Sequence, residues 1–268
     1  MKTYLSYFKL RIITNFQYRA AALAGIATQV FFGLFYLFLY IALYESNNIS
    51  NAPMSLSNLV TYMWLGQAFF ALTHPYMKDD ELVEMIKNGN LAYELIRPQS
   101  FYLKFFIKMY ARRIIGVALR FLPIIVLSSC LPKPYGLSLP YSLSCFVLFL
   151  VSLFIASLLV TSLSMIVHSL IMFLLDSRGI FSFYSVIAEL FMGGLVPLPF
   201  LPGVIKKIAD ILPFRFISDF PYRVYSGDIS SSSGLYLVLF SLLWLVIIIF
   251  IGYKISQKAL KKAVIQGG

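Results

Sequence analysis

The chain has 268 residues, of which 60% are hydrophobic and 12% are charged. With a mean hydropathy of +0.83, this composition excludes an ordinary soluble protein and predicts an all-α integral membrane protein with a single membrane domain over residues 1–268. The net charge of +11 is better explained, in so apolar a chain, by the positive-inside bias and anionic lipid than by a nucleic-acid partner.

The N-terminal segment, residues 1–19, predicts a helix that lies on the membrane surface. Tyr4, Phe8, Ile12 and Phe16 recur every four positions among basic residues. This spacing gives a basic amphipathic helix that suits the inner interface before the chain enters the bilayer.

Six membrane-spanning helices are expected from the apolar runs. The first five begin near residues 20, 59, 114, 141 and 179, and the sixth covers about 235–253. The first four end near residues 44, 76, 131 and 175. The fourth run would exceed about 50 Å as a helix, against a bilayer core of about 30 Å, so it must tilt, kink or project into the cytoplasm. The Lys and Arg residues fall mainly on one side, which places both termini in the cytoplasm.

The most charged stretch is residues 77–100, which holds five of the eleven acidic residues. Asp79 and Asp80 suit the N-terminus of a short helix, and the chain stops that helix at residues 88–90, because Asn88, Gly89 and Asn90 accept the left-handed conformation. The apolar face of this helix is expected to comprise Leu82, Val83, Met85 and Ile86.

A second short helix is expected to follow, with Leu91 and Leu95 on one face and Pro98 at its end. A simple turn between two spans needs only a few residues. An ordered, charged projection of this length therefore indicates a surface for a soluble partner, and the alternative is a solvated loop lying on the lipid headgroups.

Three ionisable residues lie within the predicted spans. Arg120 either snorkels to the inner headgroups, which is the favoured interpretation, or faces a polar interior. Glu189 is either a substrate or proton site or a neutralised structural partner. His168 is expected to be a satisfied packing residue rather than a ligand, and Cys130 and Cys145 form no CxxC pattern and are expected to pack in the core.

The chain between residues 193 and 227 predicts broken helices that enter the membrane from outside without crossing it. Gly193 and Gly194 are followed by closely spaced prolines among apolar residues, namely Pro197, Pro199, Pro202 and Pro213, the last before Phe214. This outer region also carries Lys206, Lys207, Arg215 and Arg223, against the positive-inside trend. A re-entrant pair of helices, satisfied by protein contacts or a wet cavity, explains both features.

Sequence motifs for catalysis are absent. The chain has no Walker A motif, no HExxH, no GxSxG and no clustered metal-ligand spacing. We therefore expect no catalytic residue, no metal and no cofactor in this chain.

Two stretches resemble the membrane subunits of type-2 ATP-binding-cassette transporters, the ABC-2 permeases. They are residues 86–100, with a Gly, spaced leucines and the Arg97-Pro98 pair, and the Gly- and Pro-rich residues 193–227. The order of basic interfacial helix, two spans, charged segment, three spans, re-entrant element and last span is also similar to that family. The dense aromatic pattern of polysaccharide exporters is missing.

The resemblance implies a permease of an ATP-driven exporter in a bacterial plasma membrane. Its coupling helix would dock on a separate ABC ATPase, which would bind ATP and Mg, and a second permease chain, identical or different, would complete the path. The docking residues implied are Asp79, Asp80, Glu81, Glu84, Met85, Ile86, Asn88, Gly89, Leu91, Leu95, Arg97 and Pro98. The expected substrate is an amphiphile, drug, peptide or lipid-like molecule.

Two other functions compete with the permease. One is a membrane scaffold or sensor that binds a cytoplasmic partner and transports nothing. The other is an intramembrane enzyme, which would require Glu189, His168 and Arg120 to converge, although Glu189 and His168 are expected near opposite ends of their spans.

Overall fold

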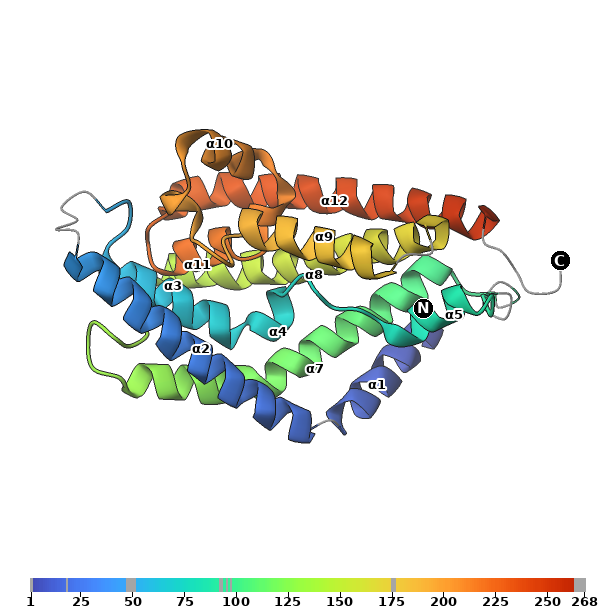
Figure 1. Cartoon of the computed structure of the whole chain (residues 1–268), viewed down its shortest axis with the longest axis horizontal. Helices are drawn as coiled ribbons and strands as arrows, with labels where there is room; N and C mark the ends of the chain where they lie inside the picture. The colour runs from blue at the N-terminus through green and yellow to red at the C-terminus, as the bar shows by residue number, and fades with distance from the viewer. Residues whose placement is uncertain are drawn as a thin grey trace.

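The computed structural model describes residues 2–17, 19–46, 52–91, 94, 96, 98–174 and 177–262. Within these ranges the backbone forms helices and their connections and no β-strand. The elements in chain order are α1 (Lys2–Phe16), α2 (Arg19–Ser46), α3 (Leu56–Ala68), α4 (Phe70–Thr73), α5 (Asp80–Lys87), α7 (Phe101–Cys130), α8 (Leu143–Leu174), α9 (Ser177–Phe191), the 3-10 helix η1 (Leu198–Phe200), α10 (Gly203–Ile211), the 3-10 helix η2 (Pro213–Phe216), α11 (Asp219–Tyr225) and α12 (Ser231–Lys262). Helices α8, α9 and α12 run along the long axis of the molecule (Figure 1).

Four described helices are long and apolar enough to cross a membrane: α2 from Ala20, α7, α8 and α12. They correspond to the first, third, fourth and sixth predicted spans. Helix α7 begins before the predicted start of the third span, at Phe101, where the Ser100 hydroxyl accepts a hydrogen bond from the Leu103 N–H and caps the helix. The sixth prediction is too short, since α12 runs to Lys262.

The second predicted span is not one continuous helix. α3 ends at Ala68, α4 is a single turn, and His74 is extended with φ −59° and ψ 127°. Pro75 follows His74, and a proline disfavours the helical conformation of the residue before it. The chain therefore leaves the helical region earlier than its apolar composition indicates.

The fifth predicted span is also shorter than expected. α9 has 15 residues, whereas a helix that crosses the bilayer needs about 20. Of the six predicted spans, the described residues thus show four as helices of spanning length.

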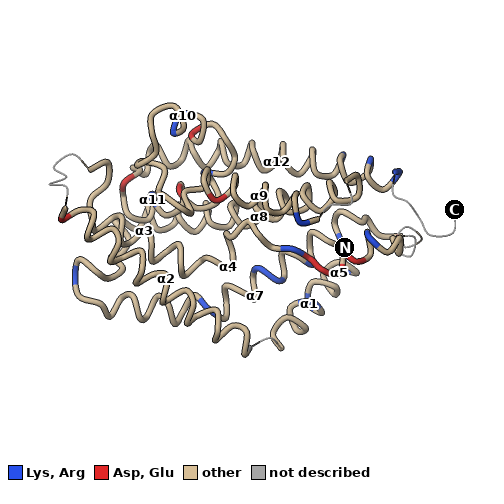
Figure 2. Tube along the Cα trace, viewed as in Figure 1, with Lys and Arg blue, Asp and Glu red and all other residues tan. Residues whose placement is uncertain are grey.

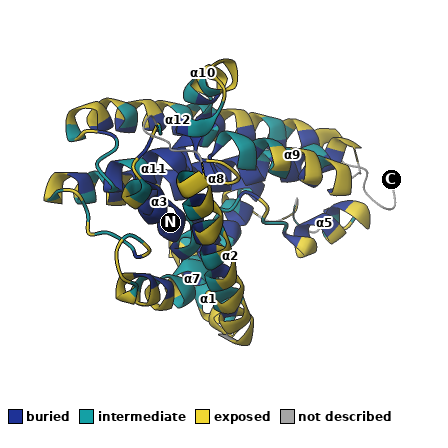
Figure 3. Cartoon of the chain, turned by 60° about the vertical axis from the view of Figure 1, so that its left-hand side comes forward, coloured by how far each residue is buried: buried dark blue, intermediate teal, exposed yellow. Residues whose placement is uncertain are grey.

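Helix α8 forms the centre of the protein. Half of its most apolar window is buried by other parts of the chain, against 22–28% for the other three long helices, and Figure 3 shows it inside the surrounding helices. Its buried Thr161, Ser164 and Ser169 donate hydrogen bonds to carbonyls four residues earlier, so their hydroxyls are satisfied in an apolar core. Ser169 also contacts Ser256 of α12 at 2.5 Å.

The predicted N-terminal helix is confirmed as α1, and it packs on α7. The ring of Phe8 stacks on Tyr110 with centroids 6.3 Å apart, and the hydroxyl of Tyr4 accepts a hydrogen bond from the Ser100 N–H. Part of the aromatic face that was expected to contact lipid therefore packs against the rest of the protein.

Charged residues gather at one end of the molecule, around α5 and the first half of α7 (Figure 2). This is the end that holds the predicted cytoplasmic segment. The last turn of α12 brings Lys261 and Lys262 to the same end.

The region from 193 to 227 consists of short helices, as expected. Pro197 precedes η1, Pro202 precedes α10, and Pro213 is the first residue of η2. Gly193 has a φ of +79°, a conformation that L side chains rarely adopt. The prolines and the glycine thus divide the chain where the sequence predicted breaks.

Candidate functional site

Helix α5 begins at Asp80 and has Asp79 as its N-cap residue, as the sequence predicts. The Asp79 carboxylate accepts a hydrogen bond of 3.0 Å from the Leu82 N–H, which is the contact of an N-cap residue. The helix ends at Asn88, and Gly89 follows with a φ of +68°. Both predicted boundaries of this helix are confirmed.

The apolar face of α5 packs inside the chain itself. Leu82, Val83 and Ile86 are buried in a cluster with α7 and α8, and Met85 is partly buried against it. This corrects the expectation that Met85 and Ile86 face a partner. The side of α5 left for a partner is its charged face, which comprises Asp80, Glu81, Glu84, Lys87 and Asn88.

The rest of the predicted docking segment is only partly described. Leu91 is buried in the same cluster as α5, and Pro98 is exposed before α7. Leu95 and Arg97 lie outside the described residues.

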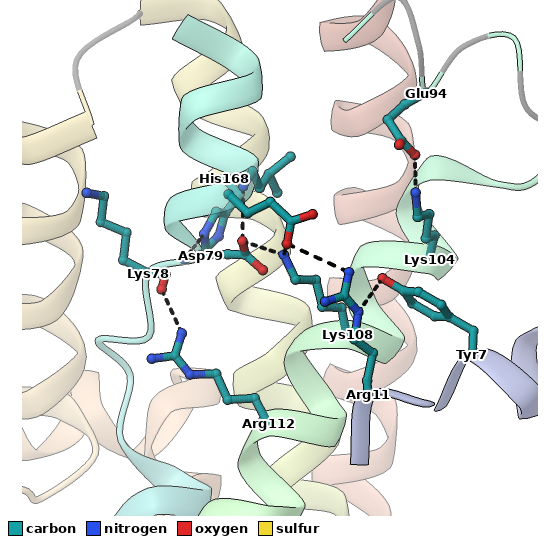
Figure 4. A network of polar contacts seen from close by, with 11 residues as sticks. Tyr7, Arg11, Lys78, Asp79, Glu94, Lys104, Lys108, Arg112 and His168 are labelled. Carbon is teal, nitrogen blue, oxygen red and sulfur yellow. Dashed lines mark hydrogen bonds and ion pairs between the residues drawn. The ribbon is translucent and has the colours of Figure 1, made fainter. Parts of the chain in front are cut away.

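A polar network joins the start of α5 to three other helices (Figure 4). Lys108 of α7 donates hydrogen bonds to Asp79 at 2.8 Å and to Glu81 at 2.5 Å. Glu81 also forms an ion pair with Arg11 of α1 at 3.7 Å. These contacts hold α5 against α1 and α7.

His168 connects the same network to α8. Its Nε2 accepts a hydrogen bond of 3.0 Å from the Asp79 N–H, and its Nδ1 lies 2.7 Å from the Ser164 carbonyl. The ring is therefore the neutral tautomer with the proton on Nδ1. The prediction of a satisfied histidine is confirmed, but its partner, the N-cap residue of α5, could not be inferred from the sequence.

Asp80 is one of the exposed charges of α5. Its carboxylate is exposed and forms an ion pair with Lys78 at 2.8 Å. The hydrogen bond from Lys78 lowers the pKa of Asp80 from its ordinary value. The carboxylate is therefore ionised at neutral pH.

Arg113 is a structural residue that was not predicted from the sequence. It is fully buried and donates hydrogen bonds to the carbonyls of Leu72 and His74 and to the hydroxyl of Ser164. It thereby ties the broken end of α4 to α8. A signal existed, since Phe105, Met109 and Arg113 lie four residues apart on one buried face of α7.

In the outer region, a buried carboxylate organises the short helices. Asp219 accepts hydrogen bonds from the Leu198 N–H and from Arg223, whose Nε donates to Asp228 at 2.6 Å. Arg215 pairs with Asp210 at 2.8 Å. Two of the four cations that oppose the positive-inside trend, Arg215 and Arg223, are therefore neutralised within this region by acids whose pairing was not predicted from the sequence.

A central cavity of about 390 Å³ lies among α2, α3, α9 and the outer region. Glu189 and Arg120, the two candidates at membrane depth, both line it. Glu189 lies 3.6 Å from Nδ1 of His74. The lining also includes six Phe and Tyr side chains, namely Phe32, Tyr36, Tyr40, Tyr62, Phe70 and Tyr222.

The lining of this cavity bears on the predictions for Arg120 and His168. Arg120 lines this cavity, as the alternative of a polar interior predicts. His168 does not line this cavity, so the convergence that an intramembrane enzyme would need does not occur. Among the described residues, no three His, Cys, Asp or Glu side chains gather as metal ligands.

The comparison with known families agrees with this architecture. A family model described as "ABC-2 family transporter protein" matches residues 25–267, which is nearly the whole chain. The chain belongs to the ABC-2 transporter family. No curated protein matches it.

As an ABC-2 permease, the protein is an integral membrane subunit of a transporter. The family match covers the charged segment, both candidate residues of the cavity and the outer region, and leaves out α1. The ABC-2 permease therefore combines two candidate sites, the charged face of α5 at one end and the central cavity.

Proposed function

We propose that this ABC-2 permease is the membrane-spanning subunit of an ATP-driven exporter in the bacterial plasma membrane. In this account α3–α4 and α9 complete six crossings, and both termini are cytoplasmic. The chain supplies half of a translocation path, and a second permease chain supplies the other half. A separate ABC ATPase binds ATP and Mg, and this chain contributes no catalytic residue.

The observation that carries the proposal is the attachment of α5 to the long helices. α5 presents exposed charges on one face while its other face is buried against α7 and α8. Asp79, at its first turn, is hydrogen-bonded to both His168 and Lys108. A partner that moves the charged face would therefore move α7 and α8 with it, as coupling requires.

The central cavity supports the proposal that movement of α7 and α8 serves to transport a bound molecule. Its lining combines aromatic side chains with polar groups, as in a small-molecule site, and its volume falls within the range of about 300–1,000 Å³ found for such sites. An amphiphile, drug, peptide or lipid-like molecule fits this chemistry.

Co-purification with an ATPase tests the proposal. The protein is isolated in detergent as wild type and as Glu84→Lys, which reverses one exposed charge of α5. Glu45→Lys, at the end of α2, is the matched control. We expect an ABC ATPase with wild type and the control and a strongly reduced amount with Glu84→Lys.

If Glu84→Lys recovers as much ATPase as wild type, the ATPase does not dock on the charged face of α5. If a folded wild-type protein brings down a different cytoplasmic protein and no ATPase, the scaffold or sensor function replaces the permease.

A further inference from the structure

Arg120 lies where two cavities of different character meet. The aromatic central cavity adjoins a second cavity of about 520 Å³ whose lining includes charged residues of α1, α5 and α7. Phe70, His74 and Arg120 line both. A molecule at Arg120 would thus have a charged environment on one side and an aromatic one on the other.

The carboxylates of the charged cavity already have cationic partners. Asp79 and Glu81 bind Lys108, Glu81 also pairs with Arg11, and Asp80 pairs with Lys78. Among the described residues, Arg120 has no carboxylate partner, and its Nε is buried without a hydrogen-bond acceptor. A guanidinium at this depth is costly to leave unpaired.

The space for this guanidinium is created by a glycine. A Cβ added to Gly25 of α2 would lie 2.6 Å from the Arg120 Cζ and 2.8 Å from its Nη1. Any side chain at position 25 would therefore push the guanidinium from its place. The absence of a side chain at Gly25 therefore leaves room for the guanidinium at the boundary between the cavities.

Gln29 adds a second unsatisfied polar group to the central cavity. Its side chain is 4% exposed and lines the cavity, yet its Oε1 has no hydrogen-bond partner. Buried polar groups are nearly always hydrogen-bonded, and an exception needs an explanation. A bound molecule with a donor group would satisfy it.

We propose that the central cavity binds an amphiphile with a single anionic group. The carboxylate or phosphate of the ligand lies on Arg120, a hydroxyl or N–H donates to Gln29, and the apolar part lies among the aromatic side chains. A guanidinium pairs well with planar or tetrahedral oxyanions. Glu189 faces the same cavity, so a second anionic group on the ligand, apart from the one at Arg120, is disfavoured.

This inference rests on the proposed transport function for its biological meaning, but binding can be measured without an ATPase. The purified protein is placed in nanodiscs of zwitterionic lipid, and saturable binding of radiolabelled dodecyl phosphate is measured. Dodecanol, dodecyltrimethylammonium and inorganic phosphate serve as competitors. Competition by dodecanol reports recognition of the alkyl chain alone, competition by dodecyltrimethylammonium reports binding of any charged amphiphile, and competition by inorganic phosphate reports recognition of the free anion.

Two variants test the site by independent means. Arg120→Gln removes the charge, and Gly25→Ala displaces the guanidinium and leaves the charge in the chain. We expect each to weaken dodecyl phosphate binding at least tenfold. Arg120→Lys restores part of the affinity, and Lys207→Gln on exposed α10 binds like wild type. Size-exclusion profiles and Tm values identify any variant that is misfolded.

Wild-type affinity of Arg120→Gln, or equal competition by dodecyltrimethylammonium, would overturn the inference. Competition by inorganic phosphate at the same concentration would also do so, because it would show an anion site without an amphiphile site. If dodecyl phosphate does not bind but the ATPase still co-purifies, the proposed permease function stands and only the proposed substrate class is wrong. If dodecyl phosphate binds at this site but no ATPase co-purifies, the protein has a site for anionic amphiphiles but is not driven by an ATPase.

Discussion

The backbone N–H of Asp79 donates a hydrogen bond of 3.0 Å to Nε2 of His168, although the two residues are 89 positions apart. This contact joins the N-cap residue of α5 to the central helix α8. It is buried, so its loss leaves an unsatisfied N–H in an apolar surrounding.

Replacement of His168 tests this connection. We expect His168→Ala to lower stability by about 1–3 kcal/mol, since a buried donor loses its acceptor, and to lower stimulation of the ATPase by more than the loss of folded protein explains. Thermal unfolding and ATPase assays in the reconstituted complex measure the two effects. His168→Gln offers an acceptor and should recover part of both, whereas unchanged stimulation in folded His168→Ala would argue against a role in coupling.

Asp79 has a double role that two substitutions separate. Asp79→Asn keeps an oxygen for the Leu82 N–H and removes the charge that Lys108 binds, whereas Asp79→Ala removes both. Loss of an N-cap costs about 0.5–2 kcal/mol. Hydrogen exchange of the α5 amides should therefore rise more in Asp79→Ala than in Asp79→Asn. Equal protection in both variants would show that the cap does not hold the helix.

Much of this site could be predicted from local sequence. The cap at Asp79 and the stop at Gly89 depend on residue types and short spacing, and both are as predicted. The burial of Ile86 was not predictable in this way, because an apolar helix face indicates that something covers it without saying whether that is the same chain or a partner.

The long helices were predicted better than the short ones for a related reason. Apolar composition identifies α8 over nearly its full length, but it does not show that α3 ends at Ala68 or that α9 stops after 15 residues. The link between Arg120 and Gly25, and that between Arg113 and Ser164, join separate helices. Such contacts depend on tertiary packing that a single sequence does not show.

Gly193 offers a test of the outer region. Its φ is +79°, and a Cβ there would lie 2.3 Å from the Tyr62 hydroxyl, which donates a hydrogen bond to the Gly193 carbonyl. We expect Gly193→Ala to lower Tm because left-handed backbone strain of about 1–2 kcal/mol is added to a clash. Gly203→Ala is the matched control, since nothing lies within 4 Å of its added Cβ. A Tm of Gly193→Ala equal to that of the control would contradict the predicted packing.

Arg113 should be among the least replaceable residues. Arg113→Lys cannot form the three hydrogen bonds to Leu72, His74 and Ser164 at once in the same geometry. We expect a loss of about 1–3 kcal/mol for the acceptors left buried and unpaired, seen as a lower Tm. Arg112→Lys is the control, since Arg112 is exposed and bonds only the Lys78 carbonyl among the described residues. A similar Tm for the two variants would show that the buried hydrogen bonds do not stabilise the fold.

Site-directed cross-linking tests most directly the claim that α5 docks on an ATPase. A cysteine replaces Glu84 on the exposed face of α5, in a background with Cys130→Ser and Cys145→Ser, and a second variant has the cysteine at Glu45 instead. A short thiol-to-amine cross-linker is applied to native membranes, and the partner is identified by peptide mass spectrometry. The account predicts a cross-link from position 84 to an ABC ATPase and none from position 45. A folded protein that gives no ATPase cross-link at position 84, or gives the same one at position 45, would contradict it.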